Sequence, residues 1–125
     1  MASERHLRAA EGGLRSADHF ARNSPRFAGW LLATAEALLD GPVEVVIVGT
    51  PSDHLTQALR RAAIETQRPG MAVATGPPQR RAKSGPFVDR PLIQGQPAAY
   101  VCRGSHCYPP VTSAQAITAL LTPSD

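Results

Sequence analysis

The sequence predicts an α/β protein (mixed α and β), with an N-terminal helical hairpin, a small β-α-β sheet subdomain and a C-terminal helix. Apolar residues recur at helical spacing in two segments before residue 40, and a continuous β-branched run, Val43–Val48, follows them. A further helical pattern and a second apolar run come next. We expect residues 1–40 to form the hairpin and residues 41–125 the α/β subdomain, with a loop-rich insertion at 76–97.

The first helix is predicted over residues 3–18, with Ser3 as its cap. Its inner face is predicted to hold Leu7, Ala10, Leu14 and Ala17. Glu4/Arg8 and Glu11/Arg15 are favourable pairs four residues apart.

The second helix is predicted from Pro25 to Leu39, with Ser24 as its cap and Asp40-Gly41-Pro42 as its stop. Its inner face is predicted to hold Phe27, Leu31, Ala35 and Leu38, widened by Trp30 and Leu39.

The run Val43–Val48 predicts a strand buried on both faces, as in a parallel sheet. Ser52 or Asp53 can cap a helix that reaches Gln67, and residues 71–75 follow as the parallel partner strand. A third strand is predicted over residues 98–102, and the segment Val111-Thr112-Ser113 is predicted to cap the last helix. The inner faces of the two helices are predicted to hold Leu55, Leu59, Ala62 and Ala63, and Ala114, Ile117, Leu120 and Leu121.

The most specific stretch is the turn that contains Cys102, His106 and Cys107. A redox dithiol favours the shorter Cys-x-x-Cys spacing. A zinc site needs four ligands, and His54 or His19 would have to complete it. A Cys–His nucleophile pair would use His106 or His54 as its base.

A disulfide that closes this turn is geometrically possible, but a cytosolic setting disfavours it. We therefore expect Cys102 and Cys107 to be free thiols that pack as small buried groups. No catalytic residue is identified, and no metal or cofactor is expected.

Charge and hydropathy limit the classes of partner that the chain can have. The formal net charge of +3 comes from scattered arginines, so a basic nucleic-acid-binding module is the third alternative, behind a structural role and a thiol enzyme. No stretch is long and apolar enough for a membrane span, and no signal peptide is recognisable. The loop Gly49–Asp53 matches neither common phosphate-binding motif. We expect a cytoplasmic protein.

A family resemblance rests on two segments. Residues 97–102 (Pro-Ala-Ala-Tyr-Val-Cys), followed by Cys107 and by Pro109-Pro110-Val111, resemble the C-terminal tail of the thioredoxin-domain-containing (DUF255, spermatogenesis-associated-protein-20-like) family. The stretch from Pro25 to Gly49 is similar to the segment that precedes this tail.

The resemblance implies a long parent architecture, with a thioredoxin-like domain followed by an (α/α)6 toroid of the six-hairpin glycosidase type. Residues 1–40 would be the last helical hairpin of that toroid, and residues 41–125 its C-terminal α/β subdomain. The chain would then be a C-terminal fragment with a structural role and without independent catalysis. Its partner would be a toroid domain, intramolecular or neighbouring, and residues 3–39 could mediate self-association.

Overall fold

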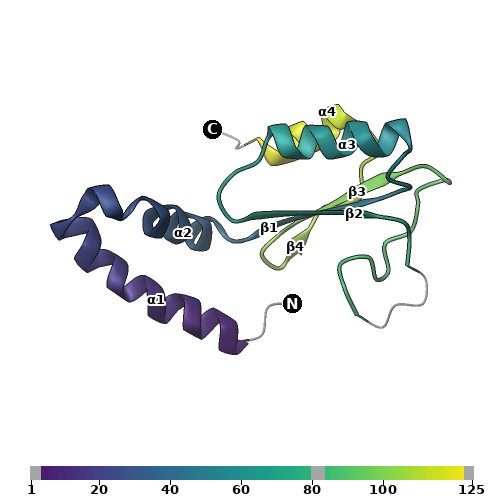
Figure 1. The fold of residues 1–125 in the computed structure, drawn as a ribbon. Helices are drawn as coiled ribbons and strands as arrows, with labels where there is room; N and C mark the ends of the chain where they lie inside the picture. Colours follow the sequence, from purple (N-terminus) through teal and green to yellow (C-terminus); the bar gives the residue numbers. More distant parts are fainter. Residues whose placement is uncertain (1–3, 80–83, 123–125) are drawn as a thin grey trace. The chain divides into compact units, whose positions relative to one another are not determined.

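A computed structural model describes residues 4–79 and 84–122 (Figure 1). The α/β class is confirmed, with four α-helices and a four-stranded mixed sheet in these residues. The chain divides into two compact units at Gly41–Pro42, and each is described by itself. No helix in these two ranges is long and apolar enough to cross a bilayer.

The first unit is a helical hairpin. It contains α1 (Glu4–Asn23), a 3₁₀ turn η1 (Pro25–Phe27) and α2 (Gly29–Asp40). Helix α1 continues beyond the predicted end, and it includes Gly12 and Gly13 without a break. The Arg8 guanidinium donates to the Glu4 carboxylate at 2.6 Å, as predicted.

Some details of the hairpin prediction are wrong. Ala10, predicted on the inner face of α1, is exposed, and no ion pair joins Glu11 to Arg15 in the described residues. The side chain of Ser24 makes no capping hydrogen bond, because the chain first forms η1 and α2 begins only at Gly29. The predicted cap Ser3 lies outside the described residues. The inner face of α2 is also narrower than predicted: Leu31, Ala35 and Leu38 are half-buried, whereas Phe27, Trp30 and Leu39 are exposed.

The second unit contains the sheet. Its elements are β1 (Val43–Val48), α3 (His54–Glu65), β2 (Met71–Gly76), β3 (Ala98–Arg103), β4 (His106–Cys107) and α4 (Ala114–Leu121). The strand order is β2-β1-β3-β4. Strand β1 is parallel to β2, as predicted, and antiparallel to β3, which in turn is antiparallel to β4.

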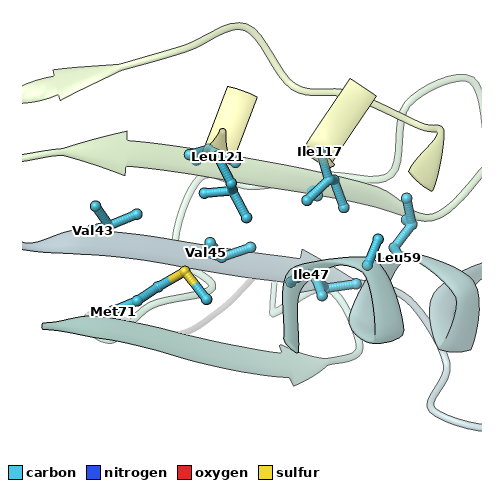
Figure 2. Close-up of a cluster of buried hydrophobic side chains, with 11 residues drawn as sticks. Val43, Val45, Ile47, Leu59, Met71, Ile117 and Leu121 are labelled. Atoms are coloured by element: carbon cyan, nitrogen blue, oxygen red, sulfur yellow. The ribbon is translucent and has the colours of Figure 1, made fainter. Parts of the chain in front are cut away.

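Helices α3 and α4 lie together on one face of this sheet (Figure 1). Side chains alternate across a strand, so Val43, Val45 and Ile47 of β1 all point toward the helices. They pack with Leu59 of α3 and with Met71, Ile117 and Leu121 (Figure 2). The predicted inner faces of both helices are confirmed, with Leu55, Ala114 and Leu120 only partly buried.

The opposite face of the sheet contacts the segment between β2 and β3. The Phe87 ring packs against Gly76, and the Tyr100 hydroxyl donates to the Pro91 carbonyl at 2.6 Å. Val46 and Val48, whose side chains point to this face, are also buried. The part of the predicted insertion after residue 83 therefore covers the sheet, which its irregular sequence did not indicate.

Candidate functional site

The candidate site is the hairpin between β3 and β4. A two-residue turn, Gly104-Ser105, joins the strands, and Gly104 has the positive φ of 56° that glycine adopts without strain. The register pairs Arg103 with His106 and Cys102 with Cys107. This geometry places the two cysteines directly opposite each other.

The pair Cys102–Cys107 occupies a non-hydrogen-bonded position of the ladder. The neighbouring Tyr108 N–H donates to the Val101 carbonyl at 2.9 Å, and backbone bonding alternates along an antiparallel pair. Cross-strand side chains lie closest at such positions. The Cα atoms of Cys102 and Cys107 are 4.0 Å apart, and their sulfurs form a disulfide bond.

The prediction of free thiols is therefore wrong for both cysteines. That prediction was based on the expected cellular compartment, whereas the turn decides whether the two cysteines lie opposite each other. A two-residue turn at Gly104-Ser105 places residues 102 and 107 opposite each other whenever the flanking residues pair as strands. The glycine-containing dipeptide between the two cysteines was the signal that could have revealed the bridge. Cys102 is buried and Cys107 is exposed.

The histidines do not gather around this turn. His106 is exposed, and its ring meets the Tyr108 ring edge-on, with centroids 4.8 Å apart. His54 begins α3, after the end of β1, whereas the turn lies beside the start of β1, so the two are at opposite ends of the sheet. His19 belongs to α1, in the other unit. Among the described residues no three His, Cys, Asp or Glu side chains are grouped as metal ligands would be.

Arg90 is the neighbour of the disulfide that sequence reasoning missed. Its Nη2 donates to the Cys102 sulfur at 3.7 Å, and its guanidinium lies 5.9 Å from the centre of the Tyr100 ring. It also donates to the Pro86 carbonyl. Burial raises the pKa of the Tyr100 hydroxyl, and the positive charge of Arg90 partly offsets that rise. No sequence pattern links residue 90 to the turn, because only tertiary packing brings it there.

The other face of the turn is tied to α4. Arg103 points to the helix side of the sheet, and its Nη2 donates to the Leu120 carbonyl at 2.8 Å. Arg68, just before β2, donates to the Leu121 carbonyl. Both arginines thus satisfy the last carbonyls of α4, where a positive charge is also favourable. The hairpin is connected to the covering segment on one face and to α4 on the other.

The loop Gly49–Asp53 has no free helix N-terminus to offer an anion. The Asp53 carboxylate accepts hydrogen bonds from the Leu55 and Thr56 backbone N–H groups, at 2.8 and 3.1 Å. The predicted cap at Asp53 is confirmed, and its negative charge would repel a phosphate. Gly49 is required for close packing, because a Cβ there would collide with the Thr56 hydroxyl.

Comparison with known proteins gives no family assignment: the chain matches no protein-family model, no curated protein and no solved structure.

Proposed function

We propose that this chain is a structural part of a larger helical assembly, in which the α1–α2 hairpin packs among further helices and the α/β unit closes the end. This is the role that the resemblance to the DUF255 family implies, with the hairpin as the last part of an (α/α)6 toroid. The partner helices would belong to a toroid domain of the same or a neighbouring chain. In this role the chain needs no catalysis of its own.

The observation that carries the proposal is the surface of α2. Trp30 is 87% exposed and Leu39 is 88% exposed, and Phe27 just before the helix is 83% exposed. A helix that is apolar on all sides is one that proteins bury. Among the described residues, α2 has no buried side chain, although seven of its 12 residues are leucine or alanine.

The positions of these residues indicate more than one missing neighbour. Leu31, Ala35 and Leu38, which the sequence placed on one face, are half-buried. Trp30 and Leu39 are nine residues apart, which is about two and a half helical turns, so they point in opposite directions. A single additional helix cannot cover both. An inner position in a multi-helix array, where each helix has neighbours on several sides, accounts for this pattern.

We predict that the full chain binds an environment-sensitive dye and self-associates as its concentration rises, because these apolar side chains lack their partners. The variant Phe27→Ser/Trp30→Ser/Leu39→Ser should weaken self-association by roughly a hundredfold or more, since burial of each large side chain contributes about 1.5–3 kcal/mol. Sedimentation velocity over a concentration series and dye fluorescence measure the two effects.

Ile64→Ser is the matched control, because Ile64 is an exposed apolar residue of the α/β unit. It should leave both readouts close to those of the unmodified chain. An unmodified chain that stays monomeric, unfolds cooperatively and binds no more dye than the triple variant would contradict the proposal.

A second candidate function, thiol–disulfide exchange at Cys102 and Cys107, is favoured by the position of Arg90. A dithiol reductant would attack the exposed Cys107 sulfur, form a mixed disulfide and release Cys102 as a thiolate. Its second thiol would then resolve the mixed disulfide, which leaves an oxidised reductant and two reduced cysteines. Arg90, at 3.7 Å from the Cys102 sulfur, would stabilise that thiolate. Glu44, opposite Cys102 in the β1–β3 register, would oppose this effect.

Titration of the reduced chain tests this second candidate. If this candidate is correct, one of the two thiols should titrate to its absorbing thiolate at a pH well below the ordinary cysteine pKa of about 8.5. Arg90→Gln should raise the midpoint pH of that titration. Arg26→Gln, on η1 of the other unit, is the control and should change nothing. Two thiols that titrate normally in the unmodified chain would remove the candidate.

The cytoplasmic location expected from the sequence remains part of the structural proposal. The Cys102–Cys107 bridge counts against it, because disulfides persist mainly in oxidising compartments.

A further inference from the structure

The two edges of the sheet are protected very differently. Strand β4 has only two residues, and Pro109-Pro110 follows it. The pairing with β3 also shifts by one residue before Ala99 meets Val111, which is a bulge. Short length, prolines and bulges are the usual means by which an edge strand avoids further pairing.

Strand β2, at the other edge, is also followed by two prolines, Pro77-Pro78, but it is three times as long as β4 and has no bulge. It pairs with β1 in an unbroken register over six residues, and its sequence Met-Ala-Val-Ala-Thr-Gly contains no charge and no proline. The Gly70 carbonyl accepts from the Val43 N–H and the Gly76 carbonyl from the Gly49 N–H, just after β1. The alternate residues Val73 and Thr75 therefore direct their N–H and C=O groups away from β1. Within residues 42–79 and 84–122, no strand pairs with that side.

A groove of about 670 Å³ lies beside this edge. Thr75 of β2 lines it, together with Arg60, Arg61, Ile64 and Glu65 of α3. Arg60 and Arg61 form no salt bridge with any described residue. The groove therefore combines outward backbone groups, an apolar side chain and an excess of positive charge.

We propose that the β2 edge and this groove bind an extended acidic segment of a partner protein, which adds to the sheet as a fifth strand. The partner backbone would pair with Val73 and Thr75, and its carboxylates would meet Arg60 and Arg61. Main-chain bonds would supply affinity, and the two arginines would select for acidic sequence.

Charge argues against a second copy of this chain as the occupant. Two β2 edges joined by a two-fold axis would bring the same groove of each copy together. Arg60 and Arg61 would then face their own equivalents, and such like-charge contacts are unfavourable. An acidic strand meets no such opposition.

Binding of a defined peptide to the full chain tests the proposal. The probe is a dye-labelled, end-blocked octapeptide that alternates glutamate with valine, measured by fluorescence polarisation. It should bind at least roughly tenfold more tightly than a lysine–valine peptide of the same length, and Arg60→Glu/Arg61→Glu should weaken binding by a similar factor. The variant Arg5→Glu/Arg15→Glu on α1 makes the same charge change elsewhere and should leave binding nearly unchanged.

Backbone pairing is tested separately from charge. N-methylation of alternate amides in the acidic peptide keeps every carboxylate but removes main-chain donors, so binding should be lost. The Val73 and Thr75 amides should gain protection from hydrogen exchange only when the unmethylated peptide is bound. Equal binding of the methylated peptide, no binding of the acidic peptide, or insensitivity to Arg60→Glu/Arg61→Glu would overturn the proposal. If a higher protein concentration without peptide is enough to protect the Val73 and Thr75 amides from hydrogen exchange, the β2 edge binds a second copy of the chain, and the proposal is wrong.

Discussion

Replacing Leu59 by alanine is expected to cost the α/β unit about 3 kcal/mol of unfolding free energy. Leu59 lies on the inner face of α3, is fully buried and packs against the sheet in the cluster drawn in Figure 2. Leu59→Ala removes apolar contacts and leaves a cavity that strands on one side and helices on the other cannot easily fill. Small domains have a total stability of about 5–15 kcal/mol, so the loss is a large share of it.

The chain contains natural probes that report on the two units separately. Its only tryptophan, Trp30, lies in the helical hairpin α1–α2, and its two tyrosines, Tyr100 and Tyr108, lie in the α/β unit. In a urea titration, Leu59→Ala should shift the transition seen by tyrosine near-ultraviolet circular dichroism. Tryptophan fluorescence is recorded alongside it as a separate readout of the helical hairpin, which is the other compact unit.

Ile64→Ala is the matched control on the same helix. Ile64 is 41% exposed, against 0% for Leu59, and its truncation should cost less than about 1 kcal/mol. Equal effects of the two substitutions would show that α3 does not bury the face described above.

Removal of the disulfide is also expected to lower the unfolding free energy of the α/β unit. The bridge closes a loop of five residue steps, from Cys102 to Cys107. The chain-entropy relation for so short a loop gives a stabilisation of about 2 kcal/mol. The double variant Cys102→Ala/Cys107→Ala should lose this amount in the tyrosine-monitored transition. The fold should persist, because Ala99 and Val111 still exchange both of their backbone hydrogen bonds.

Chemical reduction provides the control for that measurement. A reductant should destabilise the unmodified chain by nearly the same amount and leave the double variant unchanged. A transition that does not respond to reductant would mean that the bridge contributes nothing to the stability of the unit.

The elements that the sequence located well are those whose signal is local. Strand β1 was predicted at its observed bounds, because a β-branched run between Pro42 and Gly49 permits little else. The cap of α3 was narrowed to Ser52 or Asp53 and that of α4 to residues 111–113, since a short polar side chain before a helical pattern indicates a cap; the structure assigns Asp53 and Ser113. Ser24 failed as a cap because a 3₁₀ turn, a local alternative with similar sequence preferences, intervened.

The candidate site was located but its chemistry was mistaken. Cys102, His106 and Cys107 do form one turn, yet the two thiols are bonded to each other and His106 points its ring at Tyr108. The register of the β3–β4 hairpin decided this outcome. Arg90, twelve residues before Cys102, could not have been assigned to the turn, since no periodicity connects the irregular segment 84–97 with the strand that it covers.

By itself, then, the sequence determined the α/β class, the parallel β1–β2 pair and the helix faces that form the core, because hydrophobic periodicity and capping depend on neighbours along the chain. Only the tertiary structure decided the disulfide, the place of Arg90 beside it, the arginines that end α4 and the contrast between the two sheet edges. The disulfide depends on the strand register that the Gly104-Ser105 turn sets, and the other features depend on packing between distant segments, which no local pattern encodes.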